Sequence, residues 1–160
     1  MKRIFTLTIC FLIALSTACF ARALPNSEFS LGGICVTSGV TMSYVRSVYG
    51  SPTLVSDDGF TRTYRYGSTV TLKAWKTNAG EERVNYVKTT ANNGFATPAG
   101  LTVGMSKSTM QSLYGTEDPY YDKKTGYTEY MYPHMGSGAG AGMRILVDDD
   151  NTIQSIEVLD

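Results

Sequence analysis

The sequence repeats itself at a shift of about 65 residues, and this internal repeat constrains the fold more than any other feature of the chain. Apolar residues, glycines and tyrosines return in the same order in both halves. The matched segments are Gly39-Val40-Thr41 with Gly104-Met105-Ser106, Tyr49-Gly50 with Tyr114-Gly115, and, after one or two inserted residues, Tyr64-Arg65-Tyr66 with Tyr130-Met131-Tyr132. We therefore predict a tandem duplication, with one copy in residues 24–99 and the other in residues 100–160.

Each copy begins with the signals of a short helix. Thr41 and Ser106 are suitable N-cap residues, because their hydroxyl groups can accept the free backbone N–H groups of the first turn. Val48 and Leu113 extend an apolar stripe along each helix, and a glycine ends each one. Helices of about two turns are marginal on their own, so we expect both to pack against a sheet.

Three antiparallel strands should follow each helix. The segments are rich in aromatic and β-branched residues and are separated by turn residues. Because side chains alternate along a strand, Val70, Leu72 and Ala74 should face the helix, while Lys73 and Trp75 point to the other side. The predicted strands span residues 61–66, 70–75, 83–89, 127–132, 143–148 and 152–159.

The expected fold class is α+β, with two tandem repeats that each place a short helix on a three- to four-stranded antiparallel sheet. Gly-x-Thr/Ser, a two-turn helix ending in Tyr-Gly, and three strands occur in both copies, and segments 36–52 and 101–119 carry this pattern. The pattern resembles the repeat of the β-lactamase-inhibitor-protein-like fold and, as a single copy, the SmpA/BamE lipoproteins of outer-membrane barrel assembly. In the inhibitor family the resemblance implies a concave, aromatic-lined sheet that grips a partner protein.

Residues 1–23 have the features of an export signal. A basic start is followed by a largely apolar stretch, and Ala21-Arg22-Ala23 fits the small-x-small cleavage pattern. The apolar stretch is shorter than the roughly 18 residues of a membrane-spanning helix. Ser16-Thr17-Ala18-Cys19 is a degenerate lipobox. Two outcomes therefore stay open: an exported, periplasmic or secreted protein that begins at Leu24, or a chain anchored to the outer membrane through a lipid on Cys19.

Removal of the leader changes the charge of the chain. The full sequence has 14 basic and 14 acidic residues, whereas residues 24–160 have 11 basic and 14 acidic residues. A nucleic-acid-binding protein needs a basic surface that displaces counterions from phosphates, so we expect no nucleic-acid partner. Of the three cysteines, Cys35 alone follows the leader, and no internal disulfide is expected.

The chain offers little for catalysis or metal binding. A nucleophile–base couple would have to use Cys35 or His134, the single histidine. Zinc needs several His or Cys ligands. The acidic run at residues 148–151 lacks the glycine and the closing glutamate of a calcium loop, and the glycine-rich residues 136–142 lack the Lys-Ser/Thr of a phosphate loop. We therefore expect no enzyme, no catalytic residue, no metal and no cofactor.

The eleven tyrosines are the most specific functional feature. Tyrosine is enriched at protein interfaces, because its ring buries a large area while its hydroxyl group stays hydrated. Cross-strand packing in a small sheet is the alternative explanation. The predicted partner-binding residues are Tyr64, Tyr66, Lys73, Trp75, Tyr130 and Tyr132.

These features together favour a non-catalytic protein-binding module of the bacterial cell envelope that holds another protein on an aromatic sheet face. One alternative is an inhibitor of a secreted or periplasmic hydrolase such as a β-lactamase. The other alternative is an outer-membrane assembly lipoprotein, which requires lipidation at Cys19.

Overall fold

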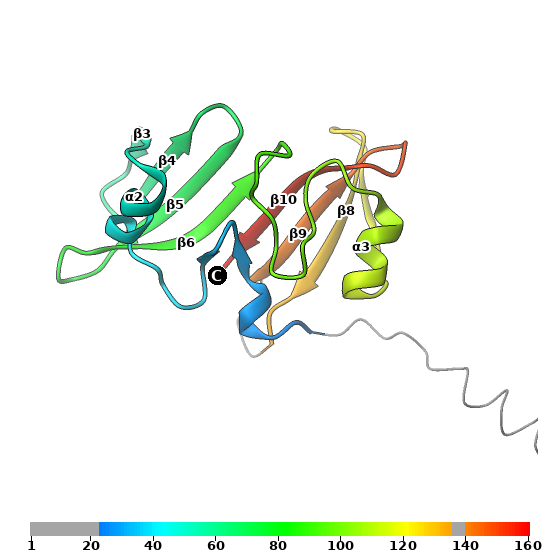
Figure 1. Ribbon diagram of the computed structural model, residues 1–160, viewed down its shortest axis with the longest axis horizontal. Coiled ribbons are helices and arrows are strands. Elements are labelled where there is room, and N and C mark those ends of the chain that lie inside the picture. Colours follow the sequence, from blue (N-terminus) through cyan, green and yellow to red (C-terminus); the bar gives the residue numbers. More distant parts are fainter. Residues whose placement is uncertain (1–22, 136–139) are drawn as a thin grey trace, which may run out of the picture.

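The computed structural model describes residues 23–135 and 140–160, and its main feature is one antiparallel sheet of eight strands (Figure 1). The strand order is β3-β4-β5-β6-β10-β9-β8-β7. The elements are η1 (Asn26–Glu28), β1 (Ser30–Leu31), β2 (Ile34–Cys35), α2 (Met42–Tyr49), β3 (Thr53–Asp57), β4 (Thr61–Tyr66), β5 (Val70–Lys76), β6 (Glu82–Thr89), α3 (Lys107–Tyr114), β7 (Tyr120–Asp122), β8 (Tyr127–Pro133), β9 (Gly142–Val147) and β10 (Ile153–Leu159).

The predicted fold class, two repeats that each place a helix on a sheet, is wrong. The described part of the chain is mostly β, with a single eight-stranded sheet, a two-stranded sheet and two short α-helices. The two strand groups join where β6 pairs with β10, for example Val87 with Val158. Both residues are fully buried. Separate sheets would leave the apolar edges of β6 and β10 unpaired, so joining them removes two exposed edges.

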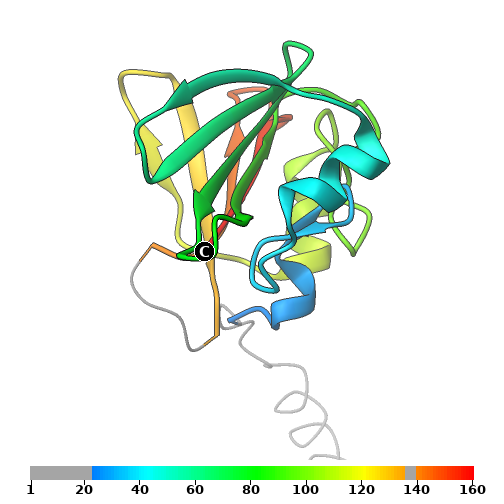
Figure 2. The ribbon, with the colours of Figure 1, turned by 90° about the vertical axis from the view of Figure 1, so that its left-hand side faces the viewer.

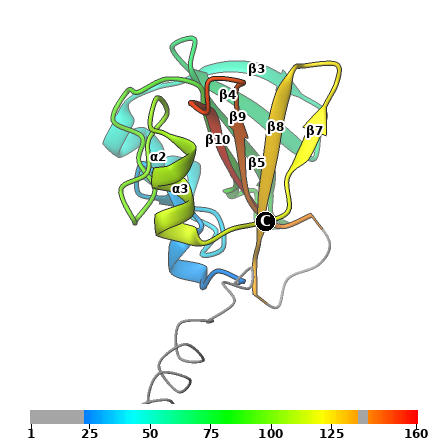
Figure 3. The same ribbon diagram turned by 90° about the vertical axis from the view of Figure 1, so that its right-hand side faces the viewer.

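The helices and loops form a second layer on one face of the sheet (Figures 2 and 3). The helix α2 lies beside the β3–β6 end of the sheet and α3 beside the β8 end, with the β1–β2 hairpin and the connector before α3 between them (Figure 1). The core lies between the two layers. Leu72 and Ile145 from the sheet, Phe29 and Ile34 from the hairpin region, and Leu101 from the connector are all fully buried.

Both helices begin at their predicted caps. The backbone N–H of Tyr44 donates to the Thr41 hydroxyl at 3.2 Å, and Ser106 accepts an equivalent bond at 3.2 Å. The prediction that Val48 and Leu113 extend the apolar stripe is wrong, because these side chains are 53% and 41% exposed. The residues that the two helices bury are Met42, Val45, Met110 and Tyr114.

The sheet is bent into a trough. The hairpins β3–β4 and β7–β8, at its two ends, reach away from the helices, while β6 and β10 in the middle lie nearest to them (Figures 2 and 3). The helix-covered face is therefore the convex one, and neither helix of residues 23–135 and 140–160 lies on the concave face. We call this second face the open face.

The export signal and the lipobox were predicted within residues 1–23, of which residues 1–22 lie outside the described residues. In the part of the chain that is described, no helix is both long enough and apolar enough to cross a membrane.

Candidate functional site

The strand pairing assigns each side chain to one face of the sheet, because directly paired residues of antiparallel strands point the same way. Tyr64 pairs with Leu72 and Leu72 pairs with Val87, which places this row on the helix-covered face. Lys73 pairs with Thr63 and with Tyr86, which places that row on the open face. The open face carries Thr53, Ser56, Thr61, Thr63, Arg65, Thr71, Lys73, Trp75, Arg83, Tyr86, Lys88, Tyr120, Asp122, Tyr127, Glu129, Met131, Pro133, Gly142, Arg144, Leu146, Ser155, Glu157 and Leu159.

The structure does not bring the six predicted partner-binding residues together. Lys73 and Trp75 are exposed on the open face. The four tyrosines lie on the helix-covered face, and three of them belong to the core. The exposed fractions are 4% for Tyr64, 2% for Tyr130 and 0% for Tyr132, and Tyr66 is partly buried against the core.

Two of these tyrosines fasten the helices to the sheet. The Tyr66 hydroxyl donates to the carbonyl oxygen of Gly50 at 2.9 Å, and Tyr132 donates to that of Gly115 at 3.0 Å. Both glycines cap helix C-termini and have positive φ values of 80° and 88°. The carbonyl groups at a helix C-terminus lack intrahelical hydrogen-bond donors. Each tyrosine hydroxyl supplies one such donor, while the ring packs in or against the core.

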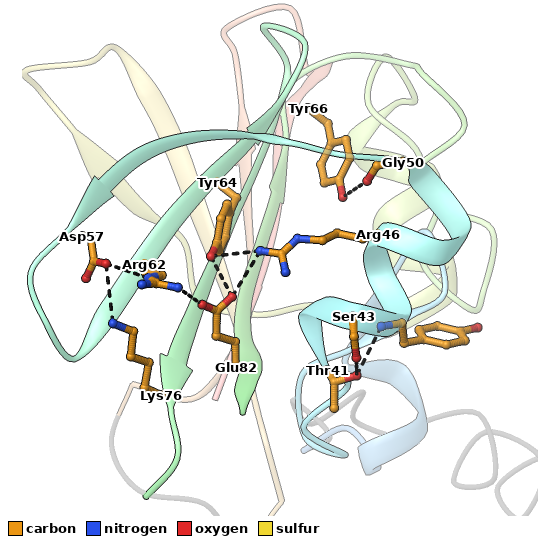
Figure 4. A network of polar contacts seen from close by, with 11 residues as sticks. Thr41, Ser43, Arg46, Gly50, Asp57, Arg62, Tyr64, Tyr66, Lys76 and Glu82 are labelled. Carbon is orange, nitrogen blue, oxygen red and sulfur yellow. Dashed lines mark hydrogen bonds and ion pairs between the residues drawn. The ribbon is translucent and has the colours of Figure 1, made fainter. Parts of the chain in front are cut away.

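A third tyrosine belongs to a polar network between α2 and the sheet (Figure 4). The Tyr64 hydroxyl donates to Glu82 at 2.7 Å, and Arg46 from α2 donates to the same carboxylate at 3.3 Å. Arg62 donates to the other oxygen of Glu82 and, through Nε, to Asp57 at 2.6 Å. The side chain of Glu82 is only 11% exposed, so each contact replaces water that the carboxylate lost on folding.

This network also sets the charge state of Glu82. Burial alone would raise the pKa of its carboxyl group, but hydrogen bonds from Tyr64 and Arg62, together with the positive charge of Arg62, lower that pKa below its ordinary value of 4.5. Glu82 is therefore anionic at neutral pH, and its contacts link α2 to β4 and β6. We interpret the network as structural.

The centre of the open face holds a second network, which joins an aromatic ring to buried and exposed charges. The ammonium group of Lys73 lies 4.9 Å from the centre of the Tyr86 ring, within cation–π range. Burial raises the pKa of Tyr86, and the nearby negative charge of Glu157 raises it further, so the phenol keeps its proton.

Glu157 is 4% exposed although it lies on the open face. Lys88 donates to it at 2.7 Å and Arg144 at 3.5 Å, and Arg144 also lies 3.2 Å from Glu129. The carboxylate is therefore covered by its own partners. The floor of the trough consists of large side chains whose positions are fixed by charge-assisted contacts.

Trp75 lies on the same face, two residues along β5 from Lys73, and is 44% exposed. It pairs across the strands with Arg83. The two side chains border a hollow of about 460 Å³, which is also lined by Asn85, Asp160 and residues 36–39 of the segment between β2 and α2. The open face thus offers an exposed tryptophan and a row of fixed polar groups.

Sequence reasoning missed Tyr86, Lys88, Arg144 and Glu157. Tyr86 and Lys88 are two residues apart on one strand and so share a face, which the sequence indicates. That they meet Glu157 and Arg144 depends on the pairing of β6 with β10, which local pattern does not encode.

His134 and Cys35, the residues that a nucleophile–base couple would have to use, both contact neighbouring side chains. The His134 Nε2 atom lies 2.5 Å from the side-chain oxygen of Asn26, and its ring packs edge-on against Phe29 at 4.6 Å. Cys35 is partly exposed, and its sulfur lies 3.3 Å from the Thr37 hydroxyl. Within residues 23–135 and 140–160, no three His, Cys, Asp or Glu side chains are placed to hold a metal ion.

Comparison with known proteins identifies no family for this chain. No family model matches the chain, and no curated protein matches it. Among solved structures, the chain is similar to the crystal structure of a DUF4309 family protein (YjgB) from Bacillus subtilis. That similarity covers 79% of this chain and 82% of the other, at 13% sequence identity and a TM-score of 0.45.

Proposed function

We propose that this protein is a non-catalytic protein-binding module and that the open face of its sheet is the binding surface. The observation that carries the proposal is the arrangement of exposed Trp75 beside Lys73 and the Tyr86 ring on a concave face that no helix of the described residues covers. Tryptophan, tyrosine and arginine dominate the binding energy of protein interfaces. Side chains that are already held in place lose little conformational entropy when a partner binds.

Export to the cell envelope is part of this proposal and rests on the leader-like residues 1–23. A partner in the envelope or outside the cell fits that location. Inhibition of a secreted hydrolase is a special case of this binding function, in which the bound protein is an enzyme.

The test is capture of a partner by the purified protein from an envelope extract of the source organism, followed by measurement of Kd with the isolated partner. Trp75→Ala and Tyr86→Ala should each weaken binding at least tenfold, because both remove large contacts from the open face. The control is Tyr44→Ala, since Tyr44 is 54% exposed and belongs to α2, which lies in the layer against the other face of the sheet (Figure 2). The proposal is wrong if Tyr44→Ala abolishes binding while the two open-face variants bind as well as the native protein.

A further inference from the structure

The charges of residues 24–160 are unevenly distributed over the molecule. The open face carries five of the eleven basic side chains of this segment but only three of its fourteen acidic ones. The five are Arg65, Lys73, Arg83, Lys88 and Arg144, and the three are Asp122, Glu129 and Glu157. The trough is therefore positive on a chain whose remaining surface is strongly negative.

The three acidic side chains of the open face already have partners. Glu157 is held by Lys88, and Glu129 lies 3.2 Å from Arg144. Asp122 accepts from the backbone N–H of Lys124 at 2.9 Å in the β7–β8 turn. These carboxylates are thus engaged within the protein and do not neutralise the cations on β4 and β5.

Two cations, one on β4 and one on β5, have no acidic partner within the described residues. Arg65 and Lys73 are both exposed, and neither forms an ion pair there. Arg65 pairs across the strands with Thr71, and Lys73 pairs with Thr63. Every polar side chain in this patch of β4 and β5 can donate a hydrogen bond, and none is a carboxylate, so the patch matches a ligand rich in acceptor oxygens.

We propose that the partner docks through an extended segment rich in Asp and Glu that lies across β4 and β5. Its carboxylates pair with Arg65 and Lys73 and accept from the threonine hydroxyls, while an apolar side chain packs on Trp75. This inference rests on the proposed function and names the chemistry of the partner. A nucleic acid is disfavoured, because its affinity comes from neutralising several phosphates and the patch has only two cations without an acidic partner.

The experiment is selection of binders from a random twelve-residue peptide library on the purified protein. Trp75, the single tryptophan of the chain, reports binding to this face by its fluorescence. We expect the selected peptides to be enriched in Asp and Glu and to contain an apolar residue. In Arg65→Glu/Lys73→Glu their affinity should fall at least tenfold. The matched control is Lys123→Glu/Lys124→Glu, which makes the same charge change in the exposed β7–β8 turn and should leave binding unchanged.

The outcomes separate the two proposals. Selected peptides that shift Trp75 emission but show no acidic enrichment, or that bind Arg65→Glu/Lys73→Glu normally, overturn the inference and leave the open face as a binding surface. Selected peptides that bind without affecting Trp75 contradict the proposed function, whereas a failure to select any peptide overturns the inference. An oligonucleotide that binds more tightly than peptides of equal charge also overturns the inference.

Discussion

The assignment of residues to the two faces predicts very different losses of stability for two aromatic substitutions. Tyr130 is 2% exposed, pairs with Ile145 in the core, and lies on the helix-covered face. Truncation of a buried aromatic residue to alanine costs about 3–5 kcal/mol, through lost burial and the cavity left behind. Trp75 is 44% exposed on the open face, where substitution costs about 0.5 kcal/mol or little more.

Domains of this size have a free energy of unfolding of about 5–15 kcal/mol, so Tyr130→Ala should remove a large share of it, whereas Trp75→Ala should unfold close to the native midpoint. The assay is equilibrium urea unfolding followed by far-UV circular dichroism, because Trp75→Ala has no tryptophan fluorescence. Equal m values in the two variants allow the midpoints to be compared directly. Equal losses of stability, or a larger loss in Trp75→Ala, would refute the assignment of the faces.

Three further predictions concern the fold. Because hydrogen bonds outweigh burial and lower the pKa of Glu82 below 4.5, its contribution to stability should be complete above about pH 4.5 and be lost as pH falls through that lowered pKa; acid unfolding of Glu82→Gln should show a weaker pH dependence over this range. Thr41→Ala and Ser106→Ala should each cost about 0.5–2 kcal/mol in urea unfolding, since each removes an N-cap hydrogen bond. Gly142→Ala should lower Tm, because the added Cβ would lie 2.5 Å from the carbonyl oxygen of Tyr132, and unchanged thermal unfolding would contradict this close approach.

Local pattern was sufficient to place both helices and six strands. The caps Thr41 and Ser106 and the alternation of Val70, Leu72 and Ala74 are local signals, and the structure confirms each of them. The outer strands β3 and β7 were missed. The strand β3 is exposed along its whole length and β7 has three residues, so neither shows the alternation of a half-buried strand.

The candidate site could be predicted only in part. Lys73 and Trp75 were assigned to the correct face from their alternation with buried neighbours. Tyr64 and Tyr130 were grouped with them, because tyrosine fits both a core that supplies a hydroxyl partner and an interface. The deciding information is the long-range pairing Tyr64 with Leu72 and Tyr130 with Ile145, which puts both rings beneath the helices.

The central claim is that the open face is the surface that meets a partner, and site-specific photocrosslinking tests it most directly. Two variants are compared in living cells of the source organism. One carries benzoylphenylalanine in place of Thr63, on the open face beside Lys73, and the other carries it in place of the exposed Tyr44 of α2. We predict a crosslinked product from position 63 and none from position 44. A product from position 44 alone would contradict the claim and place the binding surface on the helical layer.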